Sequence, residues 1–270
     1  MNINDFRYMR QGQQLSDLKL KERQLLTPLN QRGSKKEHAL LILHGFSSSP
    51  AVYRYLIPKI KAYDAIVCPV LPGHAESIHQ FSQAKATQWL ASAQDLCASL
   101  IKEYQKVDVL GLSLGGLLSC ELSKTCAVNH LYLLAPALKL HMNVPTMLNT
   151  ARLFNYLGFV HLRNAAGNIL NTEHAEITYR KLPLTTIIEM LQLVHNYQWQ
   201  APSCPVDLFL GAHDLVVDSK AVEELFLPLN NTHIHWLNNS AHVLPLDNDL
   251  SEIINCVNKK ETKKTLKTKV

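Results

Sequence analysis

The pentapeptide Gly111-Leu112-Ser113-Leu114-Gly115 limits the fold of this chain more than any other stretch. It follows an apolar, β-prone run at residues 107–110 and precedes a helical pattern that begins at Leu114. A serine between two glycines at a strand-to-helix turn is typical of a nucleophile elbow, where the tight backbone leaves no room for side chains at the glycine positions. We therefore expect the Ser113 hydroxyl to stand above the edge of a sheet. The alternative is an ordinary strand-to-helix turn with a capping serine.

Short apolar runs alternate with helical patterns along most of the chain, which predicts an α/β fold with a mostly parallel sheet covered by helices on both faces. The predicted strands are 39–43, 65–70, 107–110, 130–134, 206–210 and 232–237. The predicted helices of this core are 51–62, 85–104, 114–126, 219–225 and 248–257. In such a sheet, right-handed crossovers bring the carboxyl ends of the parallel strands to one rim.

The interval between the fourth and fifth predicted strands departs from this alternation. It contains helical periodicity at 147–157 and 184–197 but no convincing strand, and connections of this length rarely lack structure of their own. We therefore predict an inserted helical cap, with a pair of ordinary packing helices as the alternative. The predicted organisation is an N-terminal extension at 1–36, an α/β core at 37–136 and 203–258, the cap at 137–202, and a disordered basic tail at 259–270.

The positive charge of the chain is concentrated at its end. Residues 259–270 hold six lysines and one glutamate, which account for the whole formal net charge of +5. A solvated tail is favoured over contact with nucleic acid, and a weak contact with an anionic membrane surface stays as an alternative. The expected partner is a small-molecule substrate.

Cysteine usage and hydropathy indicate a reducing, cytoplasmic setting. The six cysteines lack Cys-x-x-Cys spacing and lie mostly in apolar surroundings, as free buried thiols do. The chain shows neither the layout of a signal peptide at its start nor an apolar run of about 18 residues, which a membrane-spanning helix would need.

Metal and cofactor chemistry are not expected. The sequence contains no phosphate loop and no zinc-type spacing. His233 and His235 share one face of a predicted strand, but the sequence places no cysteine or carboxylate around them. Surface histidines are therefore favoured over a metal pair.

A serine hydroxyl attacks a carbonyl only when a base takes its proton and an acceptor orients that base. Asp214 follows the predicted strand 206–210, and His242 follows the strand 232–237, so both are expected at the rim that carries Ser113. The order serine, acid, histidine is one in which such triads occur. Asp218 is set aside as a helix N-cap and Asp207 as a residue inside a strand. His213 is expected to point elsewhere, and His44 is expected to have a structural role in its loop.

Hydrolysis of an acyl group also needs two donors for the oxyanion of the tetrahedral intermediate. The backbone N–H of Leu114 is expected to be one, because it begins the helix after the nucleophile and the helix dipole favours negative charge there. The second is expected from the loop His44-Gly45-Phe46 after the first predicted strand, with the Phe46 N–H as donor.

Several motifs in this order resemble those of bacterial carboxylesterases and monoacylglycerol lipases of the α/β-hydrolase superfamily, over residues 38–258. The motifs are Leu41-Ile42-Leu43-His44-Gly45-Phe46, Leu71-Pro72-Gly73-His74, Gly111-Leu112-Ser113-Leu114-Gly115-Gly116 and Ser240-Ala241-His242-Val243-Leu244-Pro245-Leu246-Asp247. The resemblance implies a triad of Ser113, Asp214 and His242, an oxyanion hole at Phe46 and Leu114, a small cap that shapes the acyl pocket, and no cofactor. The chain departs from the family at Ala241 and Ala75, where relatives often carry glycine. The resemblance is weakest in the cap.

The prediction is a serine hydrolase that cleaves carboxylic esters of short-to-medium acyl chains through an acyl-enzyme. A thioesterase or peptidase on the same scaffold, a non-catalytic ligand-binding protein, and a lipid-surface protein recruited by the lysine tail are the alternatives. Apolar cap residues at helical spacing offer walls for an acyl chain, with cap-to-core packing as the simpler interpretation: Met142, Met147, Leu148, Phe154, Leu157, Ile187 and Leu191.

Overall fold

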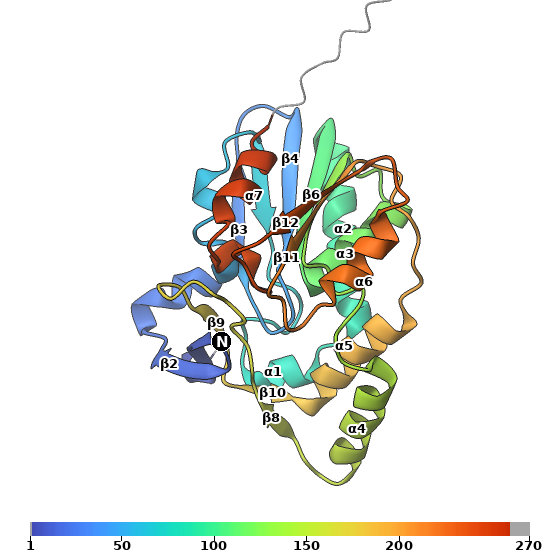
Figure 1. Ribbon diagram of the computed structural model, residues 1–270. Helices are drawn as coiled ribbons and strands as arrows, with labels where there is room; N and C mark the ends of the chain where they lie inside the picture. The colour runs from blue at the N-terminus through green and yellow to red at the C-terminus, as the bar shows by residue number, and fades with distance from the viewer. Residues whose placement is uncertain (1, 260–270) are drawn as a thin grey trace, which may run out of the picture.

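A seven-stranded sheet divides the protein into two apolar layers (Figure 1). The computed structural model describes residues 2–259. Across the sheet the order is β12-β11-β7-β6-β4-β5-β3, with β3 antiparallel to β5 and all other neighbours parallel. The strands are β3 (Leu29–Arg32), β4 (His38–Leu43), β5 (Ala65–Cys68), β6 (Lys106–Leu112), β7 (His130–Leu134), β11 (Val206–Gly211) and β12 (Thr232–Leu237). The α/β prediction and its six strands are confirmed.

Helices cover both faces of the sheet. Strand β4 shows why the central strands read as continuous apolar runs: Leu41 and Leu43 lie in one layer, while Leu40 and Ile42 lie in the other. The first layer is closed by α2 (Ala86–Glu103), α3 (Leu114–Thr125) and α6 (Ser219–Phe226). The second is closed by α7 (Leu250–Val257) and by the short 3₁₀ helices η3 (Pro50–Tyr53) and η4 (Ile57–Lys59).

The predicted helix at 51–62 is wrong, whereas the other four core helices lie close to their predicted bounds. Two separate 3₁₀ turns replace it. Pro58 explains the interruption, because proline lacks the N–H that a continuous helix needs and its ring clashes with the preceding turn. A short helix that the sequence pattern missed, α1 (Ile78–Gln83), begins with a capping box between Ser77 and Gln80.

The insertion between β7 and β11 contains strands as well as helices, so the expectation of a purely helical segment is wrong. Its helices are α4 (Val144–Tyr156) and α5 (Leu184–Asn196), and its strands are β8 (His161–Arg163), β9 (Glu176–Tyr179) and β10 (Lys181–Pro183). Strands β8 and β10 pair with each other, while β9 pairs with β1 (Phe6–Arg10). These strands are too short to show alternation in the sequence, and the partner of β9 lies at the other end of the chain.

The first 36 residues, predicted as an N-terminal extension, contribute strands to two sheets. Strand β1 links β9 to β2 (Gln13–Asp17) in a three-stranded antiparallel sheet, and β3 forms one edge of the main sheet. The 3₁₀ turn η1 (Ile3–Asp5) precedes β1, and η2 (Leu20–Leu26) connects β2 to β3. Strand β3 was missed because it is polar and largely exposed, as edge strands often are.

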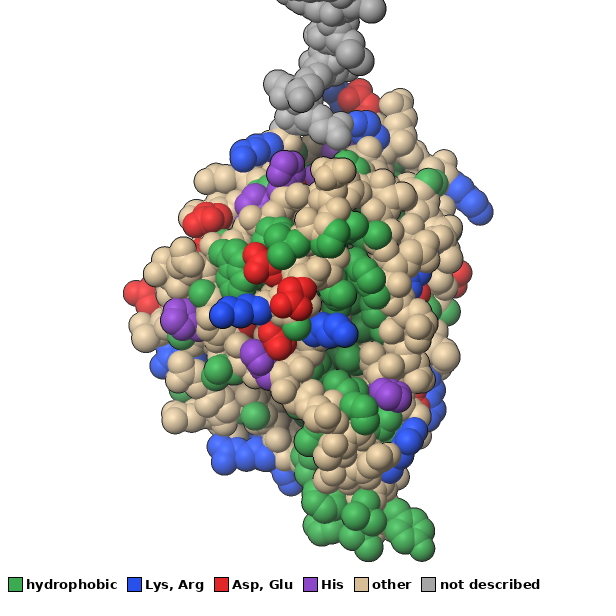
Figure 2. Space-filling view, turned by 45° about the vertical axis from the view of Figure 1, so that its right-hand side comes forward, with side chains coloured by type: hydrophobic (Ala, Val, Ile, Leu, Met, Phe, Trp, Pro, Cys, Tyr) green, Lys and Arg blue, Asp and Glu red, His purple; other side chains and the backbone are tan. Residues whose placement is uncertain are grey.

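The insertion has a small apolar core of its own and an apolar outer end. Leu148, Ala151, Leu184 and Leu191 pack between α4 and α5, with Ile187 partly buried beside them. Figure 2 shows apolar side chains gathered at the lower end of the molecule, where α4 and the loop after it lie. Four of the seven predicted cap residues are exposed, namely Met142, Met147, Phe154 and Leu157. Packing within the cap therefore accounts for the buried members of that set.

Within residues 2–259, no helix combines the length and the apolar character that crossing a membrane would require. The six cysteines are free thiols. The predicted basic tail lies outside the described residues, apart from Lys259.

Candidate active site

Ser113 occupies the turn between β6 and α3 with φ +53° and ψ −112°, a conformation that residues with a side chain rarely adopt. The flanking glycines make this turn feasible. A Cβ at Gly111 would lie 2.3 Å from the carbonyl oxygen of Gly115, and a Cβ at Gly115 would lie 2.1 Å from that of Leu43. The backbone N–H of Ser113 is held by the Leu134 carbonyl at 3.0 Å. The elbow geometry expected from the sequence is present.

Asp214 lies in the turn that follows β11, and hydrogen bonds hold both oxygens of its buried carboxylate. Oδ1 accepts the backbone N–H groups of Val216 and Val217, each at 2.8 Å. Oδ2 lies 2.8 Å from Nδ1 of His242. The next loop comes close enough for this contact because Gly211 has no side chain, since a Cβ there would lie 2.1 Å from the carbonyl oxygen of Ala241.

His242 is buried in the loop after β12 and is polarised by two carboxylates. Burial by itself lowers the pKa of His242, but Asp214 and Glu176 outweigh this effect and hold the pKa above the ordinary histidine value. Because Nδ1 is bound to Asp214, Nε2 is the nitrogen left for proton transfer. Among residues 2–259, no hydrogen bond joins Nε2 to the Ser113 hydroxyl.

Asn168, from the insertion, fastens the acid loop to the base loop. Its side-chain oxygen accepts the backbone N–H of Leu215 at 2.9 Å and that of His242 at 3.2 Å. Its own carbonyl accepts from His242 at 3.1 Å and from Val243 at 3.2 Å. Sequence reasoning missed this residue, because nothing near it in the sequence relates it to either loop.

Glu176 is a second residue that the sequence analysis missed. It lies on β9, is buried, and accepts the backbone N–H of Gly167 at 3.0 Å. Burial raises the pKa of Glu176, while the charge of His242 opposes that rise. A buried acid that interacts with the candidate base therefore comes from the insertion and not from the core.

The loop expected to carry an oxyanion donor lies against the elbow. A Cβ at Gly45 would be 3.5 Å from the Cβ of Ser113. Neither Phe46 nor Leu114 uses its backbone N–H in a hydrogen bond to another group in the described part of the chain. Both N–H groups are thus available to an incoming acceptor, which is what an oxyanion donor requires.

His44 has the structural role predicted for it. Its Nδ1 donates to the Gly45 carbonyl at 2.9 Å, and its Nε2 accepts the backbone N–H of Leu71 at 3.0 Å. Burial lowers the pKa of His44 to about 4, although the Gly45 carbonyl opposes this. The neutral imidazole therefore ties the loop of Phe46 to the Leu71-Pro72-Gly73-His74 segment.

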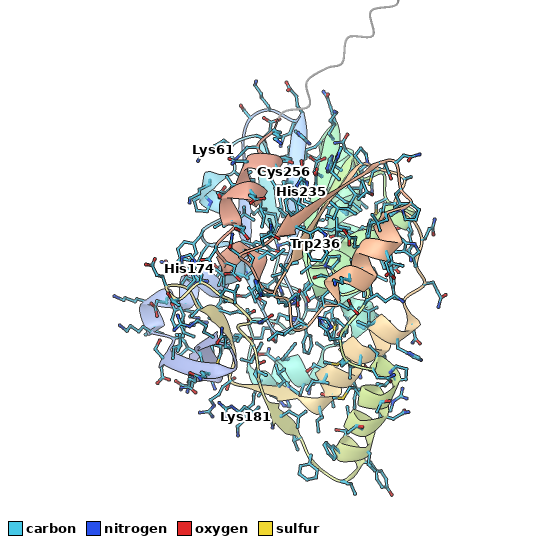
Figure 3. The ribbon with its side chains drawn as sticks, viewed as in Figure 1. Lys61, His174, Lys181, His235, Trp236 and Cys256 are labelled. Carbon is cyan, nitrogen blue, oxygen red and sulfur yellow. The ribbon has the colours of Figure 1, made fainter. Side chains whose placement is uncertain are left out.

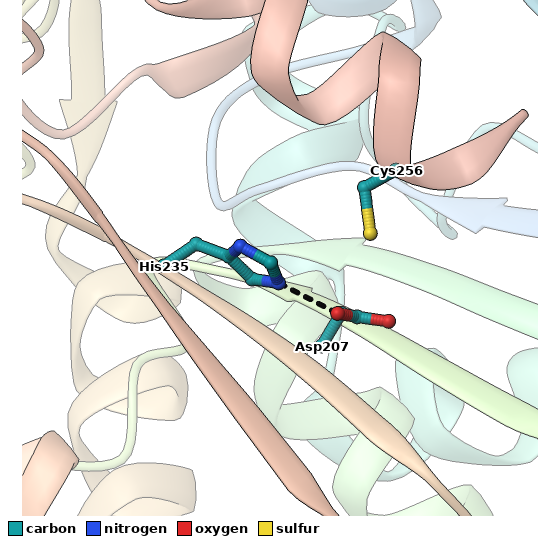
Figure 4. A group of neighbouring side chains, drawn as sticks. All are labelled: Asp207, His235 and Cys256. Carbon is teal, nitrogen blue, oxygen red and sulfur yellow. Dashed lines mark hydrogen bonds and ion pairs between the residues drawn. The ribbon is translucent and has the colours of Figure 1, made fainter. Parts of the chain in front are cut away.

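The competing acids have other partners. Asp218 caps α6 by accepting the backbone N–H of Ala221 at 3.1 Å, as predicted. Asp207 binds two imidazoles, those of His130 and His235. The expectation that no carboxylate or cysteine surrounds the His233 and His235 pair is wrong for His235, because Asp207 and Cys256 lie next to it (Figures 3 and 4). The fold brings these residues together from three separate elements.

A separate surface hollow of about 510 Å³ contains none of the predicted site residues. It lies between β1, β2 and the β8–β10 pair and is bordered by basic side chains, including Lys181, which is labelled in Figure 3. Its lining residues are Met9, Gln14, His161, Leu162, Arg163, Arg180 and Lys181.

Known proteins share this architecture. A thermostable monoacylglycerol lipase from Bacillus sp. (strain H-257) is 25% identical over 224 residues, which cover 80% of this chain and 86% of that protein. A carboxylesterase from Bacillus subtilis (strain 168) is 21% identical over 230 residues, which cover 82% and 90% respectively. A solved structure from a study of LipS and LipT, two metagenome-derived lipolytic enzymes, has a TM-score of 0.76 at 24% identity and covers 86% of this chain and 95% of its own.

A family model described as "Alpha/beta hydrolase family" matches residues 40–254. This span includes Ser113, Asp214, His242 and both loops that carry the expected oxyanion donors. It also extends from β4 into α7 and so takes in most of the sheet and the insertion. The chain belongs to the alpha/beta hydrolase family.

Proposed function

We propose that this protein is a serine hydrolase that cleaves carboxylic esters of short-to-medium acyl chains, of the carboxylesterase or monoacylglycerol lipase type. The observation that carries the proposal is the 2.8 Å contact between His242 Nδ1 and Asp214 Oδ2. The two residues follow neighbouring strands at the rim where the Ser113 elbow stands. Serine, imidazole and carboxylate on one rim are the parts that nucleophilic acyl transfer needs.

In the first half of the reaction, Ser113 Oγ attacks the ester carbonyl while His242 Nε2 takes the hydroxyl proton. Asp214 orients the imidazole through Nδ1 and stabilises its cation. The N–H groups of Phe46 and Leu114 stabilise the oxyanion of the tetrahedral intermediate, a contribution of about 3 kcal/mol for each such donor. Collapse of the intermediate breaks the bond to the alcohol oxygen, which receives the proton from His242.

In the second half, water replaces the alcohol. His242 takes a proton from the water as its oxygen attacks the acyl-enzyme carbonyl. The second tetrahedral intermediate then releases Ser113, which regains its proton, and the carboxylic acid leaves. The cycle consumes one ester and one water and yields one alcohol and one acid.

The substrate class is supported by two relatives and by the insertion. The curated relatives are named a monoacylglycerol lipase and a carboxylesterase, both of which act on esters. The insertion that reaches the active-site loops through Asn168 also carries exposed apolar side chains, among them Met142 and Met147. Apolar surroundings favour an acyl chain over a sugar or a peptide.

The test is hydrolysis of p-nitrophenyl esters with acyl chains of two to sixteen carbons by wild type, Ser113→Ala and Ser123→Ala. Ser123 is a matched control on the same helix, where its hydroxyl donates to the Cys120 carbonyl. We expect a maximum at one chain length, a loss of roughly 10⁴-fold or more in Ser113→Ala, and wild-type rates in Ser123→Ala. Normal turnover by Ser113→Ala would refute the mechanism. Faster cleavage of acyl-CoA or peptide substrates than of esters and monoacylglycerols would refute the substrate class.

A further inference from the structure

Three side chains with metal-ligating atoms meet on the face of the sheet that α7 covers, away from the candidate active site. Asp207 comes from the start of β11, His235 from β12 and Cys256 from α7 (Figure 4). The ligand atoms of all three lie within 4.8 Å of one another. Asp214 follows the other end of β11, so one strand carries the two groups at opposite ends.

Asp207 is the centre of this group. Its Oδ1 accepts from His235 Nε2 at 2.6 Å, and its Oδ2 accepts from His130 Nε2 at 2.8 Å. Burial by itself raises the pKa of Asp207, but the two imidazoles outweigh it and hold the pKa well below the usual range. The group therefore contains a buried carboxylate that stays ionised at neutral pH.

Cys256 adds a sulfur ligand. Burial raises the pKa of its thiol to about 12, and the charge of Asp207 adds to this effect. The thiol is therefore protonated in the metal-free protein, and a bound cation must displace that proton. The side chain of His235 is 29% exposed, which gives a cation a path from solvent to the group.

We propose that Asp207, His235 and Cys256 form a binding site for a divalent transition metal of the Zn²⁺ class. One oxygen, one imidazole nitrogen and one thiolate suit zinc and not calcium or magnesium, which take oxygen ligands. Three protein ligands leave a fourth position for water. His130 then supports the site from outside by its hydrogen bond to the second carboxylate oxygen.

Metal binding changes where two of the ligands carry their protons. The Cys256 thiol loses its proton to solvent as the S–metal bond forms, while the proton of His235 moves from Nε2 to Nδ1 so that Nε2 can bind the metal. The bound ion connects α7 to β12, which is an edge strand with β11 as its one neighbour in the sheet. The site therefore links two elements of the fold and is separate from the residues proposed for ester hydrolysis.

The experiment uses the full chain without a polyhistidine tag, stripped with a chelator and titrated with Zn²⁺ by calorimetry and with Co²⁺ by absorption spectroscopy. We expect one Zn²⁺ per chain, a thiolate-to-Co²⁺ charge-transfer band and a higher Tm with Zn²⁺. Cys256→Ser and His235→Gln should weaken Zn²⁺ binding at least tenfold, and Cys256→Ser should also remove the charge-transfer band.

Two matched controls make the result specific. Cys204→Ser removes another buried thiol, and His233→Gln removes an exposed imidazole from the same strand as His235. Both should bind Zn²⁺ as the wild type does. Circular dichroism of each metal-free variant checks the fold, and either ligand variant alone suffices if the other does not fold. The proposal is overturned if wild type binds no Zn²⁺, or if a folded Cys256→Ser or His235→Gln variant binds it with wild-type affinity.

Discussion

Asn168 holds His242 by two hydrogen bonds, because the backbone N–H of the histidine is shared between the Asn168 carbonyl at 3.1 Å and its side-chain oxygen at 3.2 Å. The same side-chain oxygen also accepts from Leu215, the residue after Asp214. A residue of the insertion thus sets the distance between the proposed acid and the proposed base.

Replacing Asn168 should therefore slow catalysis without unfolding the protein. Asn168→Ala removes the acceptor shared by Leu215 and His242, and a net loss of about one hydrogen bond corresponds to roughly a tenfold fall in kcat. Asn168→Asp keeps an oxygen at this position and should recover most of the rate. Steady-state kinetics and thermal unfolding of both variants provide the measurement. An Asn168→Ala enzyme with wild-type kcat would show that the two loops need no such tie.

Asp214→Asn should lower kcat by about 10⁴-fold while the fold survives. An asparagine oxygen can still accept from Val216 and Val217, but its amide cannot accept the proton of His242 Nδ1. The imidazole then favours the wrong tautomer. Asp218→Asn is the matched control, because asparagine caps a helix as well as aspartate does. Equal rates for the two variants would exclude Asp214 as the orienting acid.

Glu176→Gln should move the acidic limb of the kcat/KM profile to lower pH. His242 accepts the Ser113 proton only when it is neutral, so activity rises as pH passes its pKa. The charges of Asp214 and Glu176 raise that pKa above the histidine value against the effect of burial, so removing one charge lowers it. The exposed Glu173→Gln variant serves as control and should keep the wild-type profile. A limb that stays in place, or moves to higher pH, would contradict this assignment.

Gly115→Ala should destabilise the protein by more than about 3 kcal/mol, because the added methyl would lie 2.1 Å from the backbone oxygen of Leu43. Gly45→Ala is the comparison, since its methyl would make only ordinary contacts of 3.5 Å or more. Urea unfolding of the two variants gives the difference. Stabilities within about 1 kcal/mol of each other would mean that the elbow can open to admit a side chain.

Much of the core could be predicted because its signals are local. Most of the parallel strands are buried on both faces and are therefore largely apolar runs, as in β4, whereas β12 at the edge of the sheet is only partly buried. The elbow is readable for the same reason, since Gly111 and Gly115 are required by contacts within a single strand–turn–helix unit and its neighbouring strand. The prediction of a helix at 51–62 was wrong because it relied on the apolar periodicity and gave too little weight to a local signal, Pro58.

The rest depended on contacts between distant segments. Strands β1 and β9 are short and pair with each other although most of the chain separates them in sequence, so neither shows a pattern by itself. Asn168 and Glu176 come from the same insertion and are far in sequence from His242, on which both act. Asp207, His235 and Cys256 likewise meet through three elements that the sequence does not relate.

The sequence by itself determined the α/β class, the order of the sheet-forming strands along the chain, the Ser113 elbow and its candidate partners Asp214 and His242, because period, turn chemistry and chain order carry that information locally. Only the tertiary structure decided how the N-terminal strands join the insertion, which residues of the insertion hold and polarise His242, and that a thiol and an imidazole flank Asp207. Side chains remote in sequence become neighbours only when strand pairing and helix packing place them side by side. No local sequence pattern indicates which remote residues will meet.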